Sequence, residues 1–155
     1  MKIRRLEPAD IGACERILHA LPEWFGIEES NRAYIRDLDT LLSYVAIVDG
    51  EVAGFLSLKH HFPTASEIDV LAVERSLHRR GVGRALVERA EAGLRAAGVA
   101  LLEVKTLGPS NPDEGYRKTR EFYTALGFLA LEETATQWGP DNPSLIMVKV
   151  LGSRT

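Results

Sequence analysis

The sequence has little of three things that would place it in a specialised class of protein: cysteine, long apolar runs and surplus positive charge. It contains one cysteine among 155 residues, so no intrachain disulfide can form. No apolar run approaches the ~18 residues that a membrane-spanning helix needs. The formal net charge is −3, whereas a general nucleic-acid binder usually has a basic surplus. These absences argue against a disulfide scaffold, a membrane and a nucleic acid as a partner.

The first ten residues do not have the pattern of a signal peptide. Met1–Arg5 is basic, but Leu6–Asp10 (LEPAD) follows where an apolar core is required. The lone Cys14 predicts a reducing compartment, and we expect the protein to be cytoplasmic. Cys14 also falls on the apolar face of an expected helix, which favours a small buried side chain over a nucleophile.

The composition that remains is typical of one compact globular domain. Apolar residues make up 45% and charged residues 26% of the chain, and we find no repeat or linker, so residues 1–155 are expected to form a single domain. Apolar periodicity and turn residues predict strands early and late, with helices between them. This order indicates a mixed α/β sheet. Strands are expected near 3–6, 44–48, 52–58, 66–73, 100–105, 128–134 and 145–150, and helices near 8–21, 29–42, 82–97 and from Pro112 after an Asn111 cap.

The most informative stretch is 67–86, in which an apolar strand leads through an arginine- and glycine-rich turn into a helix. The first N–H groups of a helix have no internal partner, so they can bind a phosphate. Gly81 and Gly83 would let a phosphate approach, and Arg79, Arg80 and Arg84 add positive charge. The spacing does not fit a P-loop, and Leu86 stands where a dinucleotide fingerprint has its third glycine. A plain strand-to-helix turn with a solvated basic rim is the alternative.

This stretch resembles the acyl-CoA motif of the GNAT (GCN5-related N-acetyltransferase) superfamily, Gln/Arg-x-x-Gly-x-Gly/Ala, with His78 at the first position. A second block, 119–128, is similar to the family's Asn-x-x-Ala-x-x-Phe-Tyr-x-x-x-Gly-Phe signature, with Tyr116 and Thr119 at the Asn and Ala positions. The resemblance covers nearly the whole chain. It implies a GNAT fold: a mixed central sheet of about seven strands, splayed at its middle and flanked by about four helices.

The resemblance also implies how acetyl-CoA would bind as co-substrate. The pantetheine arm would pair with the backbone of Leu71, Ala72 and Val73, and an N–H near Ala72 or Val73 would stabilise the oxyanion. The pyrophosphate would lie on the turn that follows. Its expected contacts are His78, Arg79, Arg80, Gly81, Val82, Gly83 and Arg84.

Acetyl transfer to an amine needs one proton removed from an ammonium and one supplied to the departing sulfur. Glu67 occupies the position at which some family members hold a catalytic glutamate, and Asp69 shares its strand face, so two carboxylates could raise each other's pKa. Both could instead bind the substrate's charge or be surface residues. Tyr123 matches the family tyrosine that faces the sulfur, although a buried core tyrosine is the alternative.

Two loops would flank the acceptor pocket in such an enzyme. Glu23, Trp24 and Phe25 lie in the first, and Trp138 lies in the second, so they could form an aromatic, anionic site for an amine; ordinary loop packing is equally plausible. Adjacent His60 and His61 should point to opposite strand faces, so no metal is expected.

We therefore expect an acetyl-CoA-dependent N-acetyltransferase that acts by direct transfer on a primary amine, favouring a small molecule. A protein N-terminus or lysine is the alternative acceptor, and a module that binds acyl-CoA without turnover is the alternative class. The substrate partner would be a small amine or a peptide, and the protein a monomer or homodimer. The acceptor itself cannot be specified from the sequence.

Overall fold

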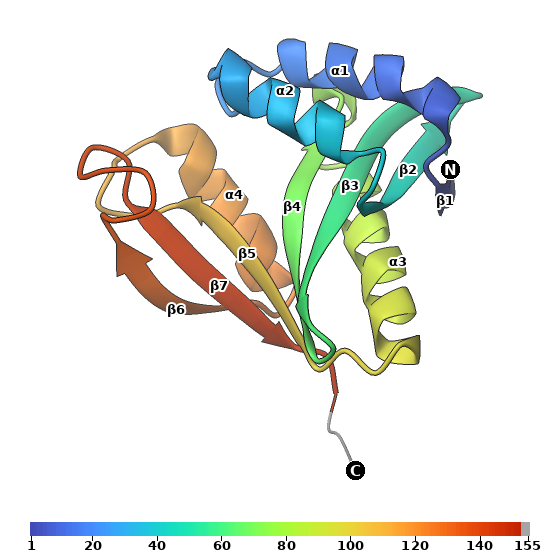
Figure 1. Ribbon diagram of the computed structural model, residues 1–155. Coiled ribbons are helices and arrows are strands. Elements are labelled where there is room, and N and C mark those ends of the chain that lie inside the picture. The colour runs from blue at the N-terminus through green and yellow to red at the C-terminus, as the bar shows by residue number, and fades with distance from the viewer. Residues whose placement is uncertain (153–155) are drawn as a thin grey trace.

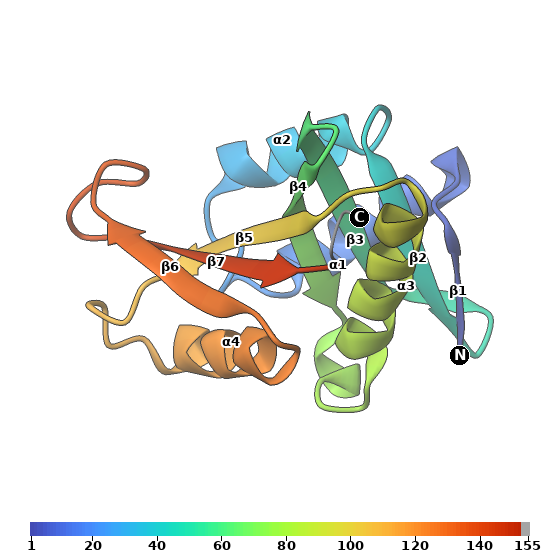
Figure 2. The same cartoon turned by 90° about the horizontal axis from the view of Figure 1, so that it is seen from below.

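The computed structural model describes residues 1–152 of the chain. In this part of the chain seven strands form one mixed sheet in the order β1-β2-β3-β4-β5-β7-β6, flanked by four α-helices (Figures 1 and 2), which confirms the expected fold class. The strands are β1 (Lys2–Arg5), β2 (Leu42–Val48), β3 (Glu51–Phe62), β4 (Ala65–Val73), β5 (Leu101–Leu107), β6 (Leu129–Thr134) and β7 (Ser144–Val150). The helices are α1 (Ile11–His19), α2 (Glu28–Asp37), α3 (Val82–Ala96) and α4 (Glu114–Ala125), with short 3-10 turns η1 (Pro8–Asp10) and η2 (Arg75–Leu77).

The two middle strands, β4 and β5, are joined along less than half of the length of β4. They are the parallel pair of the sheet, and their pairing runs only from Ala65↔Leu101 to Ile68↔Val104. Beyond Ile68 the strands separate, and Figure 1 shows them diverging from a common end toward α2 and α4. The sheet is therefore V-shaped. Strands β1 to β4 form one arm, strands β5, β7 and β6 form the other, and the root of the V lies at the four residue pairs that join β4 to β5.

Helices cover both faces of the sheet (Figure 2). In Figure 2, α3 and α4 lie on one side and α1 and α2 on the other. Residues such as Leu86 and Leu94 of α3 pack into one core, and Leu18 of α1 packs into the other. Cys14 is fully buried in that second core, and burial raises its thiol pKa to about 12. A thiol in this state is not a nucleophile at neutral pH, as the sequence predicted.

Two element boundaries differ from the sequence predictions. The helix expected to run to residue 42 ends at Asp37, because Leu42 begins β2. Asn111 does not cap α4. Its side-chain oxygen instead accepts the Asp113 N–H at 3.1 Å in a local turn, and Asp113 is the cap, accepting the Tyr116 N–H at 3.0 Å.

The predicted Asp49-Gly50 hairpin turn is present, and both of its residues have positive φ, as a tight hairpin of this kind requires. Within residues 1–152, none of the helices has the length and hydropathy to cross a membrane.

An ion pair joins the two halves of the V on the side covered by α3. Glu91 of α3 is 4% exposed, and both of its carboxylate oxygens accept hydrogen bonds from Lys149 of β7, at 3.0 and 2.9 Å. Since α3 packs on β2, β3 and β4 while β7 belongs to the other arm, this contact holds the arms together at the root.

Replacing Glu91 by Gln should lower the free energy of unfolding by about 2 kcal/mol, because the Lys149 ammonium would lose a charged, largely buried partner. Chemical denaturation would measure the change. Glu88→Gln is the matched control, since Glu88 lies on the exposed face of the same helix, and it should change stability by less than about 0.5 kcal/mol. Equal effects of the two substitutions would contradict this role for Glu91.

Candidate active site

A β-bulge in β4 sets which side chains face each side of the gap. Leu58 pairs with Ile68 and Ser57 pairs with Val70, so Asp69 is the additional residue. As a result, Ile68 packs in the core under α3, whereas Val70 packs in the core under α1. The bulge lies at the point where β5 separates from β4, and it increases the local twist there.

Backbone groups of β4 face the gap once β5 has separated. The Glu74 N–H donates to the Ala53 carbonyl at 2.8 Å, and Ala72 pairs with Phe55. Hydrogen-bonding directions alternate along a strand, so the Ala72 N–H points toward β3. The N–H groups of Leu71 and Val73 point into the gap. Of the two amides that the sequence suggested for the oxyanion, Ala72 and Val73, Val73 is therefore the one whose N–H faces the gap.

The turn between β4 and α3 leaves the N-terminus of α3 open. Gly81 has φ +84° and stands before the first helical residue, and no side chain caps the helix. The first main-chain bond of the helix runs from the Ala85 N–H to the Gly81 carbonyl at 3.0 Å. The N–H groups of residues 82–84 therefore have no helical partner and can bind an anion. Arg79, Arg80 and Arg84 are exposed around this turn.

The second glycine of the motif has a packing role. A Cβ atom added at Gly83 would lie 3.1 Å from Cζ of Phe122, so this glycine lets α3 approach α4 across the gap. Gly81, in contrast, has open space around it, and its positive φ explains the residue. The two glycines thus serve different physical needs within one turn.

His78 points inward and not into solvent. Its Nε2 lies 2.7 Å from the Val73 carbonyl oxygen, which is the last carbonyl of β4. Arg120 of α4 similarly donates to the Leu107 carbonyl, the last of β5, at 2.8 Å. Side chains therefore satisfy the carbonyl at the end of each separated strand. In this arrangement His78 supports the strand, and the exposed arginines are better placed to contact a phosphate.

The loop between α1 and α2 bridges the open end of the V through Trp24. On the β4 side, the Trp24 ring meets His78 edge-on, with centroids 5.7 Å apart, and the Arg75 guanidinium lies 5.9 Å from its centroid. On the α4 side, the Tyr116 hydroxyl donates to the Trp24 carbonyl at 2.8 Å, and the indole packs beside Gly115. Burial raises the pKa of Tyr116 to about 12, so its hydroxyl remains a donor.

The other predicted acceptor residues are placed unequally. Glu23 forms an ion pair with Arg75, which lowers the pKa of Glu23. Phe25 packs edge-on against Tyr34 of α2, so it belongs to the core beneath α1 and α2. Trp138 is 44% exposed in the loop between β6 and β7, and within residues 1–152 no aromatic ring stacks on it. Only Trp24 of these four spans the gap.

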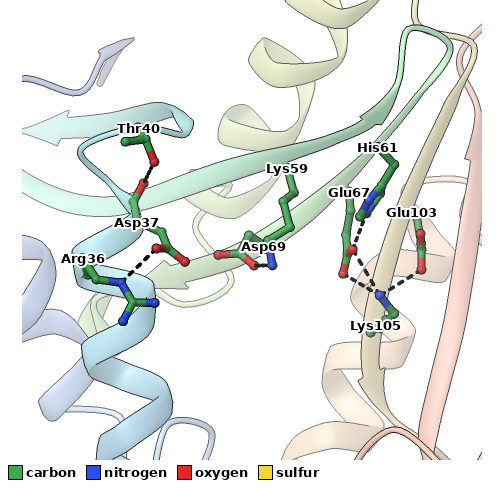
Figure 3. Close-up of polar contacts among 9 residues, drawn as sticks. All are labelled: Arg36, Asp37, Thr40, Lys59, His61, Glu67, Asp69, Glu103 and Lys105. Carbon is green, nitrogen blue, oxygen red and sulfur yellow. Dashed lines mark hydrogen bonds and ion pairs between the residues drawn. The ribbon is translucent and has the colours of Figure 1, made fainter.

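Glu67 lies at the root of the V within a group of charges from three strands (Figure 3). Lys105 of β5 donates to both Glu67 carboxylate oxygens at 3.1 Å and lies 3.3 Å from Glu103. His61 of β3 lies 2.7 Å from Glu67 Oε1. Burial alone would lower the pKa of Lys105. The hydrogen bond from Lys105 to Glu67 and the negative charge of Glu67 outweigh this effect, so the pKa of Lys105 is raised overall. Lys105 is therefore an ammonium bound to the expected base.

His61, Glu67 and Glu103 place potential metal-ligand atoms within 4.8 Å of one another. The sequence prediction of no metal considered only His60 and His61 and did not include this group. The positive charge of Lys105 already lies among these groups.

Asp69 lies on the same side of the sheet as Glu67, but each carboxylate has its own lysine (Figure 3). Lys59 is 3.0 Å from Asp69 Oδ1, and this hydrogen bond raises the pKa of Lys59. The expected direct coupling of two carboxylates is thus replaced by two ion pairs. The second oxygen, Asp69 Oδ2, is buried and accepts no hydrogen bond from the described residues.

Tyr123 lies on the opposite arm of the V, in α4. It is 5% exposed, and its ring packs edge-on between Phe122 and Phe128. Burial raises the pKa of Tyr123 well above its usual value, so the hydroxyl stays protonated near neutral pH and can act as a hydrogen-bond donor.

Residues 13–128, about three quarters of the chain, match the model of the acetyltransferase (GNAT) family. The fold and the family together define an N-acetyltransferase, and the chain belongs to the acetyltransferase (GNAT) family. None of the curated proteins matches the sequence.

Solved structures share the fold at low sequence identity. A Desulfovibrio desulfuricans protein assigned to the GNAT family superposes with a TM-score of 0.85 at 20% identity, covering 97% of this chain and 99% of that one. The Escherichia coli ribosomal-protein-S18-alanine N-acetyltransferase has a TM-score of 0.81 at 20% identity, with 99% and 96% covered. An aminoglycoside 6′-N-acetyltransferase in complex with coenzyme A has a TM-score of 0.77 at 19% identity, with 100% and 99% covered.

Removing the Tyr116 hydroxyl should loosen the loop that contains Trp24. Tyr116→Phe deletes one partly buried hydrogen bond, worth about 1 kcal/mol, so amide exchange in residues 22–27 should accelerate about five-fold while α3 is unchanged. Tyr34→Phe, which removes a phenol from α2 without breaking a hydrogen bond to this loop, is the control. Unchanged exchange in Tyr116→Phe would contradict the bridge.

Proposed function

We propose that this chain transfers an acetyl group from acetyl-CoA directly to a primary amine of a small molecule, with residues 1–155 acting as one catalytic domain. The observation that supports this most strongly is the unpaired backbone of β4 beside the uncapped N-terminus of α3. One offers hydrogen bonds to the amides of a pantetheine arm, and the other offers donors to a pyrophosphate. The similar aminoglycoside acetyltransferase structure contains coenzyme A.

In this proposal the gap between the arms holds the thioester. The pyrophosphate binds the N–H groups at Val82, Gly83 and Arg84, with Arg79 and Arg80 adding charge from the exposed side of the turn. The N–H of Leu71 or Val73 then lies beside the thioester carbonyl and stabilises the oxyanion as the amine attacks. One such donor is typically worth about 3 kcal/mol.

Tyr123 supplies the hydrogen bond or proton that the departing thiolate needs. A phenol is a weaker acid than a thiol by about 1.5 pKa units, which is roughly 2 kcal/mol, and burial of Tyr123 widens that difference. The hydroxyl therefore donates as charge builds on sulfur and does not lose its proton beforehand.

The group of side chains around Glu67 removes the proton from the acceptor's ammonium, and Asp69 binds the same amine. Asp69 Oδ2 accepts no hydrogen bond from the described residues, and an ammonium carries three N–H donors that could supply one. Transfer is direct because Cys14 is buried and its thiol stays protonated. A reduced Cys14 also fits the cytoplasmic location that we propose.

A small acceptor is favoured over a polypeptide by the Trp24 bridge. The bridge is anchored on both arms, so it narrows the open end of the V. The similar structures include enzymes named for an aminoglycoside and for an alanine of a ribosomal protein, so both classes belong in the test. Thiol release from acetyl-CoA should be measured with a panel of small amines and of peptides. Release with small amines is expected, and turnover of peptides alone would reverse this choice.

Tyr123→Phe tests the catalytic role of α4. The substitution keeps the ring packing against Phe122 and Phe128 but removes the donor, so kcat should fall by about 10- to 1000-fold with acetyl-CoA affinity nearly unchanged. Tyr44→Phe, which removes a phenol from β2 in the same core, is the matched control and should keep the wild-type kcat. A wild-type kcat for Tyr123→Phe on a verified amine would refute the role.

A further inference from the structure

The carboxylate of Glu67 has little capacity left for a direct contact with an acceptor. Its side chain is 10% exposed. Oε1 is bonded by His61 and Lys105, and Oε2 is bonded by Lys105. A carboxylate has about four acceptor positions, so the three hydrogen bonds leave about one, on Oε2, and the low exposure of the side chain leaves an incoming ammonium little surface through which to reach it.

His61 connects this buried carboxylate to solvent. Its Nε2 lies 2.7 Å from Glu67 Oε1, while its side chain is 39% exposed (Figure 3). The neighbouring His60 is hydrogen-bonded to Ser66 Oγ at 2.7 Å, and among the described residues it forms no hydrogen bond with Glu67. A lone pair on His61 Nε2 would repel a lone pair on Glu67 Oε1 at 2.7 Å. With Glu67 ionised, Nε2 must therefore carry a hydrogen and donate it to Oε1. In neutral His61 the Nδ1 atom then has the free lone pair.

We propose that His61 is the group that accepts the proton from the acceptor's ammonium, and that Glu67 is the positioning residue that orients the imidazole. This inference rests on the proposed function. The ammonium N–H bond breaks, its electron pair stays on the nitrogen as the nucleophilic lone pair, and the proton binds His61 Nδ1. Glu67 stabilises the imidazolium through the Nε2–H bond, and the Nδ1 proton later passes to solvent. A carboxylate has the same relation to a histidine in hydrolase triads.

Charge balance in the surrounding group agrees with this step. The groups that face His61 are Glu67 from β4 and Glu103 and Lys105 from β5. Two carboxylates lie against one ammonium, so one negative charge is uncompensated until His61 is protonated. Asp69 and Lys59, farther along the same face, are already paired with each other and add no net charge.

The position of His61 indicates when the proton leaves. Leu71 lies four residues beyond Glu67 on β4, which is about 13 Å along a strand, and its backbone is where the thioester is proposed to bind. The proton is therefore removed near the root of the V, before the neutral amine advances to the thioester or through water that links the two places. Histidine is suited to this task because it exchanges protons near neutral pH.

The experiment is a pH profile of kcat/KM for His61→Gln, with a verified amine and saturating acetyl-CoA. Gln retains a donor toward Glu67 but cannot take up a proton, so kcat/KM at pH 7 should fall about 100-fold. The loss should shrink as the pH approaches the pKa of the amine, and added imidazole should restore part of the rate. His60→Gln is the matched control and should behave as the wild type. Acetyl-CoA affinity should not change in either variant.

A second substitution separates this inference from the proposed function. Glu67→Gln should also lower kcat/KM, and the double variant should be little worse than His61→Gln alone, because the two side chains act as one unit. Full activity and an unaltered pH profile in His61→Gln, together with a defective Glu67→Gln, would overturn the role of His61 and leave Glu67 as the base. Full activity in both variants would overturn the base assignment of the proposed function itself.

Discussion

The early separation of β4 from β5 is the constraint on which the rest of this site depends. Four residue pairs join the strands, and the backbone of β4 beyond Ile68 then lacks a neighbour on that side among the described residues. Unpaired backbone groups in a sheet interior are costly, so a fold retains them where another partner binds. The side chains of His78 and Arg120 satisfy the last carbonyl of each strand. The N–H groups of Leu71 and Val73 face the gap, and in our proposal they bind the ligand.

Contacts at both ends of the V hold the arms at a fixed separation. At the root, Glu91 binds Lys149 on one face of the sheet, and Lys105 binds Glu67 on the other. At the open end, Trp24 is held between His78 and Tyr116. The charged cluster that we assign to proton removal is therefore also one of the structural ties. In our proposal this double role explains why Glu67 is so fully bonded, and the acid–base group is His61, which is more exposed and is hydrogen-bonded to Glu67.

The fold and the position of the candidate site could be predicted from the sequence because local patterns encode them. The run of apolar residues predicted β4, the Asp49-Gly50 pair predicted a hairpin turn, and Gly81 and Gly83 predicted the start of α3. The contributions of His61, Lys105 and Tyr116 could not be predicted, since each depends on contacts between segments 6 to 92 residues apart. The register shift at Asp69 likewise depends on the pairing of β3 with β4. Tyr116 did stand out as a departure from the family signature, but nothing local indicated that it bonds to Trp24.

The most direct test of this account is amide exchange measured residue by residue in β4, with and without acetyl-CoA. The account predicts that the N–H groups of Leu71 and Val73 become strongly protected when acetyl-CoA binds, while Ala72, already bonded toward β3, changes little. Protection should also appear at Val82, Gly83 and Arg84. Binding of acetyl-CoA that leaves Leu71 and Val73 unprotected would contradict the claim that the cofactor occupies the gap between β4 and β5.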